Sequence, residues 1–563
     1  MPEVDDVPSR HWDAIVVGAG LGGLVCAAYL AADGRRVLVT EQHDVAGGNS
    51  HVFRRRRAYE FDVGVHYLGD CGPGGVLPAI LAGVGLAGRV NFLPMDQDGF
   101  DRIELPGLTM DMPAGWRAYR DRLVAALPGE AAGLDTFVGI CSAVGTEMRD
   151  TLLSPVELTI QDLIATTPAT VAWSRRPLAE LFDHCGLSTR ARSVLAAQSP
   201  NYGMGPAQAT VGTHAMVTDH YLRGAYYPEG GGQVFAASLV EVVEANGGEV
   251  RTRCRVERIL VEDGKATGVR IRGEREPITA PLVVSNADYR RTVLELVGPE
   301  HFPAGVVKRT RAATMGMPFV TLYLGLKRAL PSRPNANVWW YDIDVDEYYK
   351  RLEAGEQGDV PFLFLSFASH KDPGSATVCP PGHTNFQAMT LCPSDYAPWG
   401  VEEGPAHGKR YRRNPEYLES KARMTERMLD SAERVLGPFR GDLAHVELGT
   451  PLTHERYTLS TAGTPFGMAQ WGSGSGRPDT RTTIDGLFVV GANTRYGSGI
   501  TGVAVSGISC ASQILERRLL PEVHAGTVLG DPGRLPDRSP GWDPLLISRG
   551  KDRHDARGLA GIG

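Results

Sequence analysis

A glycine-rich segment near the amino terminus has the residue types and the spacing of a nucleotide site. Residues 18–23 read Gly-Ala-Gly-Leu-Gly-Gly and match the pattern GxGxxG at Gly18, Gly20 and Gly23. In such a turn the first glycine permits the tight bend, the second lets the backbone approach a pyrophosphate, and the third lets the following helix pack on the strand. Glu41 follows about 20 residues later, where a carboxylate accepts ribose hydroxyls. The spacing predicts a dinucleotide site.

The flanking segments have the composition that such a site requires. Residues 14–17 form a β-branched apolar run, residues 24–32 are helical by composition, and residues 36–40 form a second strand. The N-terminus of the helix would direct unpaired N–H groups at the phosphates. Because the carboxylate of Glu41 would repel a 2'-phosphate, we expect FAD or NAD rather than NADP.

Four segments resemble a superfamily of FAD-dependent oxidoreductases that contains phytoene desaturases, carotenoid isomerases and retinol saturases. Residues 41–49, EQHDVAGGN, resemble its extended FAD fingerprint, although Asn49 replaces the usual arginine. Residues 59–70, YEFDVGVHYLGD, together with residues 91–101, resemble the retinol saturase branch. Residues 484–513 resemble the C-terminal flavin motif of the superfamily. The resemblance therefore selects FAD as the cofactor.

The resemblance also implies the fold class and the domain organisation. The fold is expected to be α/β, with a Rossmann-type FAD-binding domain of the amine-oxidase and phytoene-desaturase type and an interleaved α+β substrate domain. Several domains agree with a length of 563 residues, which exceeds what one hydrophobic core usually serves. The expected segments are FAD-binding residues 12–75, 226–300 and 451–520, a helical substrate cap at 76–225, substrate-domain sheet and helices at 301–450, and a flexible tail at 521–563.

Hydrophobic patterns place individual elements within these segments. Residues 250–261 and 266–273 alternate on either side of a Glu-Asp-Gly-Lys turn, which predicts a hairpin. Further expected elements are cap helices at 116–126 and 177–185, apolar strands at 317–326, 360–367 and within 385–391, and a long amphipathic helix at 414–436.

The glycine patterns and the resemblance together assign the cofactor contacts. The first cluster is Gly18, Gly20, Leu21, Gly22, Gly23, Glu41, Gln42, Gly47, Gly48 and Asn49; the second is Gly491, Asn493, Ser498, Gly499, Ile500 and Thr501; His66 and Val256 lie between them in the sequence. Helix N–H groups after Ser498 would face the electron-rich pyrimidine side of the flavin. Val256 stands where the superfamily offers backbone groups to the adenine. Asn493 follows the strand glycine where the family often has an acid, so its amide is expected to reach the ribityl chain or a phosphate.

The resemblance implies hydride transfer between FAD and a carbon of a long hydrophobic polyene, retinoid or other lipid. Saturation, desaturation and isomerisation of a carbon–carbon double bond all remain open. Candidate catalytic groups near the flavin ring are His66, Tyr67 and Tyr496, and each also has a purely structural interpretation.

Two other functions remain open at this level. A flavin amine oxidase or dehydrogenase would hold its amine in an aromatic cage, and the cluster Trp339-Trp340-Tyr341 offers one, although core packing explains such clusters more often than ligand stacking does. A lipid-binding protein with a redox-silent, structural FAD is the third interpretation.

Composition excludes several classes of protein. The formal net charge of −7, without a dominant basic face, gives no sign of a nucleic-acid surface. The eight cysteines show no CxxC pair or zinc spacing, which indicates reduced thiols and no metal site. The acidic start of the sequence lacks a secretory signal, so a cytoplasmic location is expected.

Residues 76–90 form an apolar stretch that is too short to span a bilayer. They are expected to be a buried core helix. In the resembling families this neighbourhood lies near the entrance of a lipid tunnel, so a peripheral membrane contact is the alternative.

Overall fold

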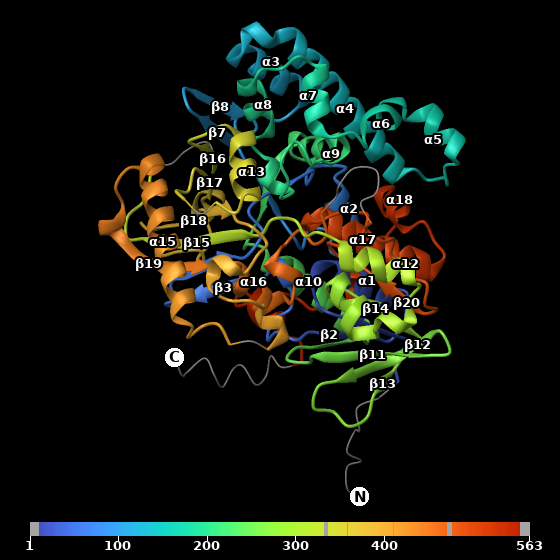
Figure 1. Ribbon diagram of the computed structural model, residues 1–563. Coiled ribbons are helices and arrows are strands. Elements are labelled where there is room, and N and C mark those ends of the chain that lie inside the picture. The colour runs from blue at the N-terminus through green and yellow to red at the C-terminus, as the bar shows by residue number, and fades with distance from the viewer. Residues whose placement is uncertain (1–10, 332–335, 357, 409, 470–475, 552–563) are drawn as a thin grey trace, which may run out of the picture.

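The computed structural model describes residues 11–331, 336–356, 358–408, 410–469 and 476–551. A nucleotide-binding domain surrounds a parallel sheet, a substrate domain surrounds a mixed sheet, and a group of helices forms a cap at the top of the view (Figure 1). The expected α/β class is confirmed.

The nucleotide-binding domain is built on a five-stranded parallel sheet. The strand order is β10 (Glu249–Arg251), β2 (Val37–Thr40), β1 (Ala14–Val17), β14 (Leu282–Ser285) and β20 (Leu487–Val489). The central strands are continuously apolar because both faces of the sheet are covered, one by helices and the other mainly by an antiparallel three-stranded sheet. The pairing of β1 with β2 and β14, and of β14 with β20, unites segments from both ends of the chain.

Three helices of this domain pack closely together. Helix α1 (Leu21–Ala32) contacts both α10 (Gln233–Ala245) and α17 (Gly499–Leu515). A Cβ atom at Gly507 would lie 2.4 Å from the carbonyl oxygen of Gly22, so α1 and α17 touch backbone to backbone. This contact brings the two predicted cofactor motifs side by side.

The expected hairpin is confirmed beside the nucleotide-binding sheet. Strands β11 (Val256–Glu262) and β12 (Lys265–Ile271) are antiparallel, and β13 (Ile278–Thr279) adds a third strand. The two turn residues, Asp263 and Gly264, have φ of 48° and 76°, as a tight hairpin turn of this kind requires.

The substrate domain is built on a seven-stranded sheet. Its order is β19 (Leu443–Gly449), β15 (Phe319–Leu326), β18 (Thr384–Leu391), β17 (Phe362–Ser366), β16 (Asn337–Tyr341), β7 (Asp101–Leu105) and β8 (Leu108–Met112). Only the pairing of β16 with β7 is parallel among the described strands of this sheet. The three predicted strands are confirmed, and α15 (Pro415–Leu436) is the predicted amphipathic helix, which buries Met428 and Ala432 against the sheet.

The cap consists of helices from the first half of the chain. They are α3 (Trp116–Ala126), α4 (Ala131–Leu153), α5 (Ile160–Thr166), α6 (Pro168–Trp173), α7 (Leu178–His184), α8 (Thr189–Ala196) and α9 (Val211–Leu222). Helix α2 (Val76–Gly83) buries Leu77 and Ile80 in the nucleotide-binding domain, which confirms the core-helix interpretation of that stretch. Within the described residues no single helix has the length and apolarity to cross a bilayer; α3 and α4 pass this test only as a pair bent by 115°.

Residues 521–551, which were expected to form part of a flexible tail, instead pack on the nucleotide-binding domain. Trp542 Nε1 donates a hydrogen bond to Glu241 Oε1 at 2.6 Å, and the Arg538 guanidinium lies 3.9 Å from the Trp542 ring centroid. Polar contacts of this kind leave no periodic apolar pattern in the sequence. The packing of this segment on the nucleotide-binding domain could therefore not be predicted from it. The predicted tail residues 552–563 lie outside the described part of the chain.

The end of this docked segment, residues 543–551, is here called the C-terminal strap. It crosses the loop that follows β2. The backbone N–H of Ala46 donates to the Ser548 carbonyl oxygen at 2.8 Å, and Arg549 Nη1 donates to Asp44 Oδ2 at 3.0 Å. The strap therefore holds a loop that the sequence assigns to the cofactor.

Candidate active site

A cavity of about 1120 Å³ lies where the nucleotide-binding domain, the substrate sheet and the cap meet. All 20 residues assigned to the site from the sequence line this cavity except Gly23. Gly23 lies behind the wall because its role is packing: a Cβ there would be 2.5 Å from the Gly18 carbonyl oxygen. The structure thus brings together two motifs that are far apart in the sequence.

Glycine is required at the point where the two motifs meet. A Cβ at Gly20 would lie 2.7 Å from Nδ2 of Asn286, and one at Gly491 would lie 2.7 Å from Oδ1 of the same side chain. A Cβ at Gly22 would lie 3.1 Å from the Gly491 Cα. Bare backbone therefore forms the cavity floor, which is the surface that a pyrophosphate needs for close approach.

Asn286 is a residue of this floor that the sequence analysis missed. Its Nδ2 donates to the Gly18 carbonyl oxygen at 3.2 Å, so it fixes the tight turn of the first motif. The only sequence signal was its place after the apolar strand β14.

Glu41 stands at the end of β2 with 8% of its surface exposed. Oε2 accepts a hydrogen bond from the Ala19 N–H at 2.9 Å, and Oε1 accepts one from the His43 N–H at 2.8 Å. Burial raises the pKa of Glu41, while these N–H groups oppose the shift. The carboxylate is thereby held rigid at the cavity wall, and its contact with ribose hydroxyls stays a prediction.

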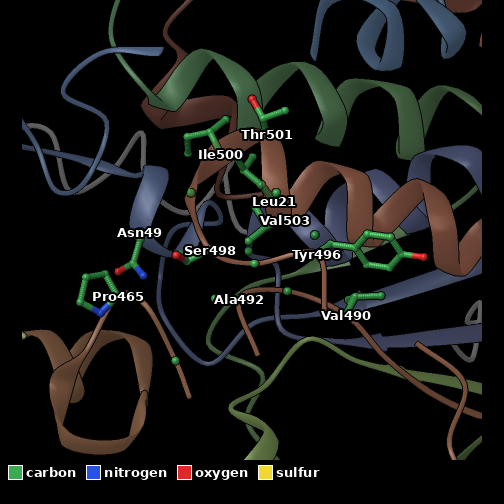
Figure 2. Close-up of a pocket in the computed structure, with 18 of the residues that line it drawn as sticks. Leu21, Asn49, Pro465, Val490, Ala492, Tyr496, Ser498, Ile500, Thr501 and Val503 are labelled. Atoms are coloured by element: carbon green, nitrogen blue, oxygen red, sulfur yellow. The ribbon is translucent and has the colours of Figure 1, made fainter. Parts of the chain in front are cut away.

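The N-terminus of α17 presents unsatisfied polar groups to the cavity. Ser498 occupies the N-cap position without a side-chain capping bond, and Thr501 Oγ1 is buried without a partner among the described residues. Figure 2 shows Ser498 near Asn49 and Pro465, with Ile500 and Thr501 on the first turn of the helix. Orphaned donors at a helix start favour a ligand with electron-rich atoms, as the pyrimidine side of a flavin has.

Two of the assigned side chains are engaged by the protein itself. Gln42 Nε2 donates to the Tyr457 carbonyl oxygen at 2.6 Å, and Asn493 Oδ1 accepts from the Met468 N–H at 2.8 Å. The expected cofactor contact of Asn493 thus concerns its Nδ2 group alone. Val256 also lines the cavity, and its contact with the adenine stays a prediction.

His66 lies at the boundary between the cofactor floor and the substrate sheet. Its Nδ1 is buried without a hydrogen-bond partner, and its ring meets Phe364 edge-on at 5.8 Å between centroids. Burial, together with the nearby charge of Lys371, lowers the pKa of His66 to about 3. The imidazole is therefore neutral at physiological pH, and its catalytic role stays a prediction.

Tyr67 is held by a buried polar network. Its hydroxyl donates to Asp101 Oδ2 at 2.9 Å and accepts from Asn201 Nδ2 at 3.1 Å. Asp101 is fully buried and also accepts from Trp339 Nε1 at 2.9 Å. The Tyr67 ring stacks on Tyr221 at 4.2 Å between centroids. Burial raises the pKa of Tyr67 well above its ordinary value, so the phenol stays protonated.

Tyr496 lines the same cavity as His66 and Tyr67, but its hydroxyl is engaged by a neighbouring side chain. Its hydroxyl pairs with Arg495 Nη2 at 3.0 Å, and the Arg495 guanidinium lies over its ring. Figure 2 shows the Tyr496 ring directed away from Ser498 and Asn49. This geometry favours the structural interpretation of Tyr496.

The aromatic cluster in β16 belongs to the protein core. Trp339 is fully buried and stacks on Phe364 at 4.0 Å, and the Tyr341 hydroxyl donates to the Ala197 carbonyl oxygen at 2.7 Å. Trp340 points to the other face of the sheet, beneath the Arg434 guanidinium. None of the three lines the cavity, which confirms core packing rather than an amine cage.

Two further histidines of the cavity wall were missed by the sequence analysis. Burial lowers the pKa of both His51 and His454 to about 4, so both are neutral. His454 Nε2 is buried without a partner, whereas His51 Nδ1 lies 2.5 Å from the Gly48 carbonyl oxygen. No cluster of potential metal ligands occurs in the described ranges.

Comparisons with known proteins agree with this geometry. The family model of flavin-containing amine oxidoreductases matches residues 21–515. All-trans-retinol 13,14-reductase of Macaca fascicularis is 30% identical over 91% of this chain and 87% of that protein. Chloroplastic prolycopene isomerase of Daucus carota is 26% identical over 90% of this chain and 80% of that protein. The solved structure of cyclohexylamine oxidase from Brevibacterium oxydans shares the fold, with a TM-score of 0.58 and 15% identity over 91% of this chain and all of that one. These likenesses agree with the glycine-lined cavity floor and with the unsatisfied polar groups at the start of α17. The chain therefore belongs to the family of flavin-containing amine oxidoreductases and is an FAD-dependent oxidoreductase similar to retinol saturases and carotenoid isomerases.

Proposed function

We propose that this protein saturates, desaturates or isomerises a carbon–carbon double bond of a long hydrophobic polyene, retinoid or other lipid. The observation that carries the proposal is the apolar extension of the cavity beyond the cofactor floor. Phe319, Phe364, Met389 and Phe466 line it on the substrate side. The retinol reductase and prolycopene isomerase named above act, by their names, on substrates of this chemical class.

The site provides little acid–base chemistry and much positioning. FAD, when bound, supplies the redox step by exchanging a hydride with the substrate carbon chain. His66 and Tyr67 are both neutral, so they can orient a substrate or exchange a proton without adding charge to an apolar compartment. Gly20, Gly22 and Gly491 bring backbone against the cofactor, and the aromatic walls exclude water.

The geometry argues against an amine substrate. The aromatic pair on the cavity wall, Tyr67 and Tyr221, stacks at an interplanar angle of 13°, which leaves no gap between the rings for an ammonium group. The β16 aromatics do not face the cavity.

An absorbance experiment tests the proposal. The purified protein should be yellow and release FAD on denaturation. Under anaerobic conditions, one class among retinoids, carotenoids and unsaturated fatty acyl compounds should bleach the flavin band, or should reoxidise the flavin after chemical reduction. Bleaching by an amine, with hydrogen peroxide formed in air, would support the amine oxidase alternative. A bound flavin that no panel member changes in either redox state would support the redox-silent alternative only if the reduced protein also leaves the double-bond geometry of every polyene in the panel unchanged, because isomerisation returns the flavin to its starting redox state.

We also propose that the protein, expected in the cytoplasm, rests peripherally on a lipid surface through α5 and α6. Ile160, Ile164 and Val171 are 76%, 57% and 59% exposed, although they are large aliphatic residues. The two helices project from the edge of the cap (Figure 1). Helix α6 contacts α9, whose half-exposed Met216 lines the cavity, so this surface adjoins one entrance.

Flotation with liposomes of neutral phospholipid tests this surface. The variant Ile160→Ser/Ile164→Ser should float less than the wild type, with an unchanged flavin spectrum. The matched control, Leu418→Ser/Val446→Ser, removes two exposed aliphatic residues from the substrate domain and should float normally. Equal flotation of both variants would contradict the assignment.

A further inference from the structure

Arg477 is a cation close to the cofactor loops that has no acidic partner. Its Nε donates to the Met468 carbonyl oxygen at 2.8 Å, and Nη1 donates to the Ala492 carbonyl oxygen at 2.6 Å and to the Thr494 carbonyl oxygen at 3.3 Å. Nη2 donates to the Phe466 carbonyl oxygen at 2.9 Å. Every acceptor is thus a neutral peptide group, and no carboxylate of the described residues forms an ion pair with Arg477.

This guanidinium is partly buried, and its partial removal from water carries an electrostatic cost. Burial lowers the pKa of Arg477 to about 9, whereas hydrogen bonds to carboxylates raise the pKa of Arg55 and Arg102. Peptide carbonyls satisfy the N–H donors but supply no full negative charge. If Arg477 served only to connect two loops, a neighbouring carboxylate would stabilise its charge, yet none of the described residues forms an ion pair with it.

The position of Arg477 identifies the missing charge. The cavity is lined by Phe466, Ala492 and Asn493. Arg477 does not line it and lies one layer behind these residues. In a trans peptide the N–H points opposite to the carbonyl. Because the Ala492 carbonyl oxygen faces Arg477, the Asn493 N–H points away from it. This peptide group therefore directs its N–H, which carries partial positive charge, away from the guanidinium.

The start of α17 lies next to this loop and adds to the same field. Its unsatisfied N–H groups carry the positive end of the helix dipole, and a hydrogen bond of 3.0 Å from the Gly497 N–H to the Thr494 carbonyl oxygen folds this end back on the loop. Two positive sources thus flank one section of the cavity, where the resemblance places the ribityl chain beside Asn493 and the pyrimidine side of the flavin beside the start of α17.

We infer that Arg477 is a positioning residue whose charge stabilises the negative charge of two-electron-reduced FAD and so raises the reduction potential of the bound cofactor. The inference rests on the proposed binding of FAD in this cavity, but it is independent of the identity of the substrate. The same cation could instead serve the pyrophosphate, which is negative in both redox states and would leave the potential unchanged.

Potentiometry with reference dyes, in the absence of substrate, tests the inference. The potential of the bound flavin in the wild type should exceed that of free FAD in the same buffer, and a lower value would overturn the inference without any variant. In Arg477→Gln the binding of reduced FAD should weaken at least tenfold more than that of oxidised FAD, which lowers the potential by about 30 mV. Arg477→Lys keeps the charge and should restore most of this shift.

A matched control separates the charge from the fold. Arg481→Gln removes an exposed arginine from the same segment and should change neither the potential nor the affinity for FAD. If Arg477→Gln and Arg477→Lys lose the same amount of FAD and keep the wild-type potential, the arginine acts on structure or on the pyrophosphate, and the inference is wrong. A colourless wild-type protein would instead refute the proposed function.

Discussion

The Nζ atom of Lys371 lies 2.6 Å from the backbone carbonyl oxygen of His66. A second hydrogen bond, also 2.6 Å long, joins the same nitrogen to Ser366 Oγ. Lys371 is only 7% exposed, and burial lowers its pKa to about 7, although the charges of Asp101 and Asp62 oppose the shift. A neutral amine has two N–H groups, and both find an acceptor here. The lysine can therefore lose its proton near neutral pH and still support the loop that carries His66.

This arrangement predicts a pH-dependent stability. In the unfolded chain lysine keeps its proton up to about pH 10.4, so above pH 7 the unfolded state binds more protons than the folded state and stability rises with pH. Relative to Lys371→Met, the free energy of unfolding of the wild type should be flat below pH 7 and gain about 2 kcal/mol by pH 9. Denaturant titrations at several pH values measure this. As a control, Lys350→Met changes an exposed lysine, and its unfolding free energy should depend on pH as that of the wild type does. The same pH dependence in Lys371→Met and the wild type would contradict the lowered pKa of Lys371.

Tyrosine variants distinguish the catalytic candidates. Tyr67→Phe keeps the stacking on Tyr221 but removes the hydroxyl at the cavity wall, so kcat with the proposed lipid substrate should fall about tenfold or more while FAD stays bound. Tyr496→Phe removes a hydroxyl that faces Arg495 and should leave kcat unchanged. Single-turnover bleaching of the flavin band measures both. The reverse ranking would return Tyr496 to the active site.

The contact between α1 and α17 predicts a large effect of one methyl group. Gly507→Ala would place a Cβ 2.4 Å from the Gly22 carbonyl oxygen, so the helices must separate. We expect a loss of about 2 kcal/mol in unfolding free energy, together with weaker FAD retention. Gly139→Ala lies on the exposed face of α4 with no atom within 4 Å and should stabilise the protein by about 0.5 kcal/mol. Thermal unfolding with flavin fluorescence reports both effects.

The C-terminal strap predicts that the cofactor depends on residues far from it in sequence. A chain that ends after Trp542 lacks the contacts to Asp44 and Ala46, and its loop after β2 should hold FAD about tenfold more weakly, since about 1.4 kcal/mol of loop support is lost. A chain that ends after Lys551 keeps the strap and should bind FAD as the full chain does. Equal affinities for the two truncated chains would show that the strap is dispensable.

The parts of the site that the sequence revealed are those in which the backbone dictates the residue type. Gly20 and Gly491 could be recognised because no side chain fits where they lie, and Glu41 because its distance from the glycines is nearly constant in such units. The strands of both sheets were predictable for a similar reason, since burial on two faces requires continuous apolar runs.

The remainder depends on pairings that no local pattern encodes. Asp101 joins Tyr67 to Asn337 and Trp339 of strand β16, so three separate regions of the chain meet at one carboxylate, and each residue alone looks ordinary. The docking of Trp542 is likewise held by polar contacts across some 300 residues of sequence. Such partners become visible only when the chain is folded.

The strand order of the parallel sheet has a consequence for biosynthesis. Strand β1 leaves the ribosome first, but its partner β14 follows only after the whole cap, and β20 closes the sheet only near the end of translation. Until then the edge of β14 is open and α1 lacks α17. Cofactor capture must therefore be a late event in the life of the nascent chain, and messages truncated before β20 would yield products with an exposed sheet edge that are prone to aggregate.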